Sequence, residues 1–211
     1  MIAKSMVGYV KGSSVIRAMF EEGKRLAKIY GAENVYDFSL GNPSVEPPKQ
    51  VREAMIDILQ NENQNLVHGY MSNAGYEDVR DTIAKSLNKK FGTSFAEKNI
   101  LMTVGAAGGL NVIFKTLLDP EDEVITFSPF FGEYRNYVAN YGGKLVVVPP
   151  SEDFIPRPEM LAAAVTKKTK ALIINNPNNP TGVVYSEEVI KSLMDVLRDK
   201  QKEFGTSIYL I

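Results

Sequence analysis

Cysteine is absent from this chain of 211 residues, and His68 is its only histidine. No disulfide framework can form, and a single histidine argues against a zinc or haem site. The sequence also lacks an excess of charge of either sign, with 24 lysines and arginines against 25 aspartates and glutamates. There is thus no basic surface to predict nucleic-acid binding, and no acidic tail.

Long hydrophobic runs are missing as well. The first residues lead into no apolar segment of the length that a signal peptide needs, and no later run could span a bilayer. We therefore expect a cytoplasmic protein. Hydrophobic residues make up 44% of the chain, which is near the globular average and supports a core for one good-sized domain or two small ones.

The first hundred residues show mainly helical patterns. Apolar residues at helical spacing predict helices over residues 14–30, from Val51 onward, and from 79 to 91 along one face. A short strand is expected at residues 37–40, running into a loop rich in glycine and proline. His68 falls in a polar loop between helices, where we interpret it as a surface or loosely packed histidine.

From residue 100 onward, short apolar runs alternate with helical patterns. Ser186 is placed to cap the last of these helices. Such alternation predicts an α/β domain with a mostly parallel sheet. Because the sequence stops inside the last strand, which would leave an unpaired edge, we expect a fragment. The expected strands are residues 100–104, 124–127, 144–148, 171–174 and 207–211.

The most informative segment is the loop 175–182, Asn-Asn-Pro-Asn-Asn-Pro-Thr-Gly, directly after the aliphatic run 171–174. Ligands bind at the carboxyl ends of strands in open parallel sheets. The prolines restrict Asn176 and Asn179, which precede them, to extended conformations, and this orients their side chains. We interpret the loop as part of a binding site rather than as a stiff turn alone.

Two further loops are expected at strand ends. Residues 105–109 are small and come between a strand and a helix start, where backbone N–H groups and the helix dipole favour a phosphate. They fit neither G-x-G-x-x-G nor G-x-x-x-x-G-K-[ST], which disfavours a nucleotide-binding α/β protein. In 128–132, one of Phe130 and Phe131 is expected in the core and the other over a flat ligand, although both rings in the core fits the spacing equally well. A phosphate cradle, an aromatic cover and an oriented amide together suit pyridoxal phosphate.

Seven segments, in order, resemble the amino-terminal half of class I/II aminotransferases, the fold-type-I pyridoxal-phosphate enzymes that include aspartate aminotransferase. The resemblance covers essentially the whole chain. It implies a three-layer αβα large domain with a mostly parallel sheet, incomplete here, over residues 47–211, and an amino-terminal arm with a small-domain segment over 1–46. The seven segments are residues 14–17, 40–43, Tyr70 with 74–75, 104–106, 119–124, 128–131 and 178–182.

The resemblance implies a role for each cofactor-binding residue. The backbone N–H groups of Gly105, Ala106 and Ala107 would hold the phosphate of pyridoxal 5'-phosphate. In many relatives a hydroxyl or lysine side chain assists there, which neither alanine can do. Phe131 takes the position of the residue that stacks on the cofactor ring.

Three residues are implied in binding the substrate or in crossing between subunits. Asn179 would donate to the phenolic oxygen of the cofactor and lie near the substrate carboxylate. Gly41, in the entrance loop, would lie by the same carboxylate. Tyr70 would reach the cofactor phosphate of a partner subunit, so a homodimer with shared active sites is implied.

The implied reaction is transamination between an amino acid and a 2-oxo acid. It needs a lysine that holds the cofactor and a carboxylate that keeps its pyridine nitrogen protonated. Both family positions come after residues 208–211, and we interpret Lys115, Lys170 and Lys191 as structural rather than as stand-ins. We therefore expect the chain as given to contain no catalytic residue and to be inactive. The alternatives are a noncatalytic or regulatory relative that binds the cofactor, and a C–S lyase or decarboxylase of the same family.

Overall fold

The computed structural model describes residues 2–3, 6–8, 15–39, 41 and 45–211. It divides into two compact units, one within residues 1–70 and the other formed by 71–211. The domain boundary expected between residues 46 and 47 stays a prediction. Of the segments that carry the family resemblance, Ser14, Leu40, Asn42 and Pro43 lie outside the described residues.

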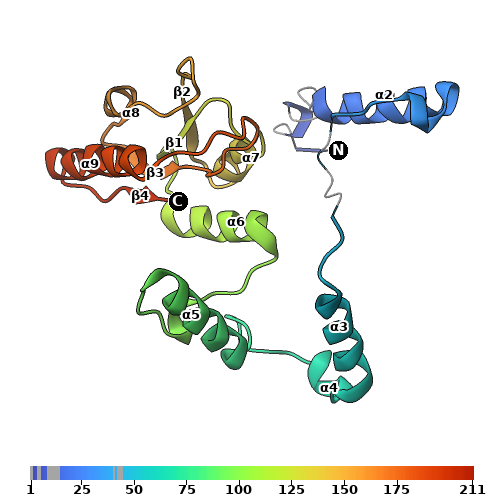
Figure 1. The fold of residues 1–211 in the computed structure, drawn as a ribbon. Helices are drawn as coiled ribbons and strands as arrows, with labels where there is room; N and C mark the ends of the chain where they lie inside the picture. The colour runs from blue at the N-terminus through green and yellow to red at the C-terminus, as the bar shows by residue number, and fades with distance from the viewer. Residues whose placement is uncertain (1, 4–5, 9–14, 40, 42–44) are drawn as a thin grey trace. The chain divides into compact units, whose positions relative to one another are not determined.

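The first unit is helical in its described part (Figure 1). The two longest helices confirm the helices predicted for residues 14–30 and from Val51 onward. His68 is exposed and directly follows the short helix Gln64–Val67. The strand expected at 37–40 is wrong for its described part, since Asp37 Oδ1 instead accepts a hydrogen bond from Ser39 N at 2.8 Å. Such a local turn competes with strand pairing. The helices are α2 (Val15–Tyr30), η1 (Ala32–Asn34), α3 (Lys49–Asn61) and α4 (Gln64–Val67).

The second unit contains a sheet of four parallel strands in the order β2-β1-β3-β4, which confirms the expected parallel α/β fold. β1 and β3 are the central pair, with Thr126 opposite Ile173 near their carboxyl ends. β4 lies at one side of the sheet and pairs only with β3 among the described residues, and both of its side chains are exposed. The strands are β1 (Glu123–Phe127), β2 (Lys144–Val148), β3 (Thr169–Ile173) and β4 (Tyr209–Leu210).

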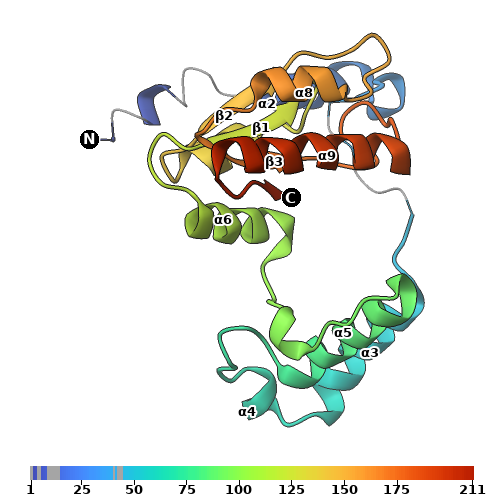
Figure 2. The same ribbon diagram turned by 90° about the vertical axis from the view of Figure 1, so that its left-hand side faces the viewer.

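Helices cover both faces of this sheet because side chains along the strands alternate in direction (Figure 2). Ile125 and Leu172 point to one face and pack with residues of α8 and α9. Val124 and Ala171 point to the other face and pack with residues of α6 and α7. All four are fully buried, and burying each of the larger side chains contributes roughly 1.5–3 kcal/mol to folding. The helices of this unit are α5 (Glu77–Phe91), η2 (Glu97–Asn99), α6 (Gly105–Leu117), α7 (Tyr134–Ala139), α8 (Pro158–Ala164) and α9 (Glu187–Phe204).

Helix α9 shows how local sequence signals set an element. Ser186 Oγ accepts a hydrogen bond from Val189 N at 3.3 Å, which confirms the predicted cap. The helix ends at Gly205, whose φ of 66° is in the left-handed region that favours glycine. Along the described part of the chain, no helix combines the length and apolar character needed to cross a membrane.

One strand prediction in this unit is wrong. Residues 100–104 form no strand. Among the described residues, they make a single backbone hydrogen bond to a residue distant in sequence, from Met102 N to Ala74 O at 3.0 Å. A strand needs a neighbouring strand to complete its hydrogen bonds.

The helix predicted over residues 79–91 is confirmed by α5. On its predicted apolar face Ile83 and Leu87 are half-buried, whereas Val79 and Phe91 are exposed.

Candidate functional site

The central strands bring two of the predicted loops together. β1 and β3 are parallel neighbours, so residues 128–132 and 175–182 leave the sheet side by side at the edge where these strands end, which we call the carboxyl edge. Ser128 N still bonds to Val148 O at 2.9 Å, which keeps the start of the first loop level with the end of β2. The sheet thus positions Phe131 and Asn179 on adjacent loops.

Helix α6 begins toward the same edge. Its far end is fixed at the opposite side of the sheet, where Leu118 packs directly against Gly143, the residue before β2. Phe114 is buried against the sheet, so α6 lies along this face and its first residues point toward the carboxyl edge. Asn111 also accepts a hydrogen bond from Asn140 at the end of α7, at 3.3 Å, which aligns the two helices.

Residues 105–109 are the first turns of α6 rather than a loop before it, which corrects the sequence prediction. Gly105 has a φ of 65°, and its N–H donates to Thr103 O at 3.0 Å. Within the described residues, the N–H groups of Ala106 and Ala107 have no acceptor, as is usual for the first turn of a helix. Residues 105–107 are all exposed, so two of the three predicted phosphate donors are available in this conformation.

The two phenylalanines after β1 divide as one of the sequence interpretations predicted. Phe130 packs against the core around Phe114 and Val124, whereas Phe131 is 39% exposed. The ring of Phe131 meets the buried ring of Tyr134 edge-on, with centroids 5.7 Å apart, and this contact restricts its orientation. Burial raises the pKa of the Tyr134 hydroxyl. An exposed, braced ring at the carboxyl edge is suited to cover a flat ligand.

Three of the four asparagines in the loop 175–182 hold the loop together. Asn175 Oδ1 accepts from Asn179 N at 2.8 Å. Asn176 bonds to both backbone groups of Tyr185, accepting from N at 2.9 Å and donating to O at 3.2 Å. The buried Asn178 accepts from the N and Oγ1 of Thr181, at 3.3 and 2.9 Å. Their amides are committed to the loop itself.

Asn179 is the exception. Its side chain is exposed and makes no hydrogen bond among the described residues. Both Asn176 and Asn179 were predicted to be oriented, and the structure separates them, because Asn176 serves the backbone whereas Asn179 is left free. Gly182 closes the loop with a φ of 73°, which favours glycine, and its N–H donates to Asn178 O at 2.7 Å.

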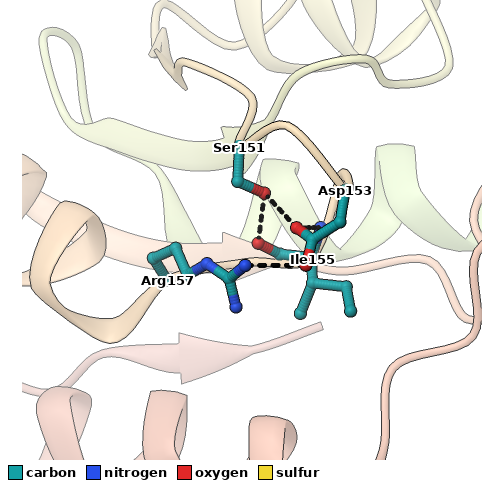
Figure 3. A network of polar contacts seen from close by, with 4 residues as sticks. All are labelled: Ser151, Asp153, Ile155 and Arg157. Carbon is teal, nitrogen blue, oxygen red and sulfur yellow. Dashed lines mark hydrogen bonds and ion pairs between the residues drawn. The ribbon is translucent and has the colours of Figure 1, made fainter.

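The loop after β2 adds a rigid neighbour at the carboxyl edge (Figure 3). Asp153 accepts hydrogen bonds from Ile155 N at 3.1 Å and from Arg157 at 2.7 Å, and Ser151 Oγ lies 2.9 Å from it. The Ile155 N–H, followed by the Ser151 hydroxyl and Arg157, lowers the pKa of the Asp153 carboxyl. Residues of this loop line a narrow crevice with Ser128, next to the start of the Phe131 loop.

Gly41 and Tyr70 belong to the first unit. Gly41 is exposed, with no heavy atom of the described residues within 4 Å of the place where a Cβ would be. The side chain of Tyr70 is fully exposed. Their implied contacts, with the substrate carboxylate and with a partner subunit, stay predictions.

None of the three lysines weighed as stand-ins belongs to the loops of the carboxyl edge. Lys115 is exposed on α6, with Nζ 5.8 Å from the centre of the Tyr141 ring. Lys191 forms an exposed ion pair with Glu187 on α9. Lys170 is near the amino end of β3, and its Nζ lies 3.7 Å from a carboxylate oxygen of Asp122. Among the described residues no cluster of acidic and histidine side chains suits a metal ion.

Sequence reasoning missed two features of this unit. Tyr185 is buried at the far end of the Asn-Pro loop, where burial raises the pKa of its hydroxyl and a hydrogen bond from Asn178 opposes that rise. Arg80 is buried on α5. Its helical spacing of four from the buried Ala84 was the available signal, and the charge of arginine obscured it.

The fold and these loops define an α/β domain that presents hydrogen-bond donors and an aromatic ring at the ends of parallel strands. The profile of the family described as aminotransferase class I and II matches residues 33–202. The chain therefore belongs to this family, whose enzymes typically use pyridoxal phosphate.

Individual relatives agree with this assignment. The chain is 37% identical over 158 residues to a probable aspartate/prephenate aminotransferase of Thermus aquaticus, covering 74% of this chain and 40% of the relative. The crystal structure of an amino transferase from Eubacterium rectale matches with a TM-score of 0.94 at 41% identity, covering 100% of this chain and 54% of that one.

The aspartate aminotransferase of Thermus thermophilus with maleate matches with a TM-score of 0.80 at 30% identity, covering 100% and 53% of the two chains. These matches confirm the aminotransferase fold expected from the resemblance. The chain spans about half the length of the relatives it matches.

Proposed function

We propose that this chain is part of a pyridoxal-phosphate-dependent aminotransferase that transfers an amino group between an amino acid and a 2-oxo acid and acts as a homodimer. The observation that carries the proposal is that adjacent strands β1 and β3 lead into loops with an exposed Phe131 ring and with an Asn179 amide that has no hydrogen bond among the described residues.

The residues at this edge have the chemical groups that pyridoxal phosphate needs. The amides of Ala106 and Ala107 are exposed donors at a helix start, where the dipole favours a phosphate. The Phe131 ring offers an apolar face for the pyridine ring, and Asn179 offers a donor for its phenolic oxygen. When bound, pyridoxal phosphate supplies the electron sink that stabilises negative charge at the α-carbon of an amino acid.

The side chains of this chain have binding and orienting roles in the proposal. Phe131, whose ring contacts Tyr134, would cover one face of the cofactor ring and exclude water there. Asn179 would help to orient the ring through its amide. Gly41 leaves room for the substrate carboxylate, and Tyr70 contributes to the site of a partner subunit.

Residues 1–211 alone are proposed to bind without catalysing. The position of Lys170 beside Asp122, and the solvated positions of Lys115 and Lys191, leave no lysine of these three to hold the cofactor covalently.

The test uses two proteins, the gene product that carries these residues and the 211-residue chain. Each is mixed with pyridoxal phosphate, followed by absorbance, treated with borohydride to fix any lysine-bound cofactor, and analysed by mass spectrometry. The gene product should retain the label and consume an amino donor. Aspartate is the first donor to try, because several relatives are named aspartate aminotransferases. The 211-residue chain should bind pyridoxal phosphate reversibly, and no single lysine of it should retain the label.

Absence of a cofactor absorbance change in the gene product would refute the proposed function. A label retained at one lysine of the 211-residue chain would refute the proposal that residues 1–211 alone bind without catalysing. The family assignment would be unaffected.

A further inference from the structure

Arg80 is a buried arginine without a carboxylate partner. It is 7% exposed and, within the described part of the chain, forms no ion pair. Its guanidinium instead donates to two backbone carbonyls, from Nε to Gly75 O at 3.1 Å and from Nη1 to Glu97 O at 2.9 Å. Burying a guanidinium is costly unless its donors are satisfied, so these bonds are a stringent local constraint.

The two carbonyls belong to segments that have no strand pairing of their own. Gly75 closes a turn in which its N–H donates to Ser72 O at 2.9 Å and its own carbonyl accepts from Ser72 Oγ at 2.5 Å. Glu97 begins η2, which leads into the extended residues 100–104 and then into α6. Arg80 therefore links the turn 72–75 to the start of the segment that leads to the predicted phosphate site.

The turn and that segment also touch directly. Met102 N donates to Ala74 O at 3.0 Å. A Cβ added to Gly75 would lie 2.4 Å from Met102 Cγ and 3.9 Å from Arg80 Cδ, so both side chains flank the glycine. Gly75 also has a φ of 100°, which only glycine adopts without strain. The position of Met102 is thus set by a turn that Arg80 holds.

The first turn of α6 depends on this connection. Residues 105–107 are exposed, and the only fully buried residue of the helix is Phe114, well beyond them. Among the described residues, the bond from Met102 to Ala74 is the only backbone hydrogen bond from 100–104 to a residue outside 97–108. Thr103 then bonds to Gly105 through its Oγ1, at 3.1 Å. These amides are therefore held from one side by the body of α6, which Leu110 and Phe114 anchor in the core, and from the other side by the connecting segment.

We propose that Arg80 is a positioning residue for phosphate binding, acting through Gly75 and Met102 on the amides of Ala106 and Ala107. The inference rests on the proposed function, since it takes those amides to bind the cofactor phosphate. The planar guanidinium can hold two carbonyls in a fixed relation, whereas lysine is a single point donor and cannot. Arg80→Lys is therefore the informative change, because it keeps the charge and loses the link.

The experiment compares the wild-type gene product with Arg80→Lys in three measurements. The Kd for pyridoxal phosphate and for inorganic phosphate should rise by about tenfold, as for one lost hydrogen bond to a charged group. The Kd for pyridoxal, which lacks the phosphate, should stay within about twofold. Hydrogen exchange at the Met102 amide should become faster, whether or not phosphate is present.

Two further variants separate positioning from general loss of stability. Leu197→Ala removes a buried side chain of α9 on the other face of the sheet and should lower Tm without changing the phosphate Kd. Met102→Ala changes a residue that is 42% exposed, so the protein should fold even if Arg80→Lys does not, and should weaken phosphate binding in the same direction.

The proposal is overturned if Arg80→Lys leaves the exchange of Met102 unchanged, if pyridoxal and its phosphate weaken equally, or if Leu197→Ala weakens phosphate binding as much. A wild-type protein that binds pyridoxal phosphate no more tightly than pyridoxal would instead contradict the proposed function, while the exchange measurement would still decide the role of Arg80.

Discussion

Side chains of one type have separable roles in the loop 175–182. Asn175, Asn176 and Asn178 bond to the loop and its base, whereas Asn179 is exposed without such a bond among the described residues. The prolines identified Asn176 and Asn179 from the sequence alone, since each precedes a proline. They could not distinguish the two, because the partner of Asn176 is a backbone nine residues further on, at Tyr185.

Exchanging Asn179 for alanine should therefore affect cofactor binding, whereas exchanging Asn176 for alanine should affect stability. Asn179→Ala should raise the Kd for pyridoxal phosphate by about tenfold and change the free energy of unfolding by less than about 0.5 kcal/mol. Asn176→Ala leaves two backbone groups of Tyr185 without their partner and should cost about 1–3 kcal/mol. Cofactor titration and denaturant unfolding of both variants measure the contrast. Equal destabilisation by the two would contradict the division.

The Asp153 network makes a prediction about pH. Since hydrogen bonds lower the folded-state pKa of Asp153, its stabilising contribution is present above the unfolded pKa of about 3.9 and is lost as the pH falls through the lower folded value. Asp153→Asn should therefore be less stable than wild type at neutral pH, and the difference should shrink in acid. Denaturant unfolding across this range tests it. Glu152→Gln, an exposed neighbour, is the control and should show no comparable difference.

At the scale of whole elements, local signals were sufficient where an element is amphipathic and has clear ends. The helix from Ser186 and the strand 144–148 follow from caps and apolar runs. Residues 100–104 show where local signals fail. They have a strand-like composition but no strand beside them, and a partner far away in sequence decides whether a strand forms.

The cap of α9 gives a prediction at this scale. Ser186→Ala removes the acceptor for Val189 N and should cost about 1 kcal/mol, whereas Ser186→Gly should cost only a few tenths. Ser192→Ala is the matched control on the same helix. Among the described residues its hydroxyl bonds to Val189 O of the same helix and to no other group, so alanine should be neutral or slightly stabilising there. Denaturant midpoints of the three variants, at constant m-value, measure the effect.

For the whole molecule, the alternation of strands and helices was enough to predict the α/β class and a mostly parallel sheet, and the family resemblance implied the helices on both faces. The neighbouring positions of the loops after β1 and β3 also followed, since parallel neighbouring strands end together, whereas residues 105–109 follow no strand. The division of the described chain at residues 70 and 71 had no sequence signal, because no linker-like composition marks it. The engagement of the Gly105 amide by Thr103 had none either, since it depends on the exact start of α6.

Stability of the second unit should depend on its sheet far more than on its loops. Leu172→Ala empties a fully buried position between β3 and the helices α8 and α9, and should cost about 2–5 kcal/mol. Val184→Ala, at a position 64% exposed, should change the free energy of unfolding by less than about 0.5 kcal/mol. Chemical unfolding of both variants provides the comparison, and similar losses would show that the core has been misassigned.

The open side of β4 has a practical consequence for handling this polypeptide. Tyr209 and Leu210 expose their side chains next to a row of backbone groups that, in the described residues, bond only toward β3. Strands from other molecules can pair with such an exposed edge strand. Concentrated preparations of the 211-residue chain should therefore self-associate at β4. A lysine in place of Tyr209 would discourage that growth without touching the ligand loops.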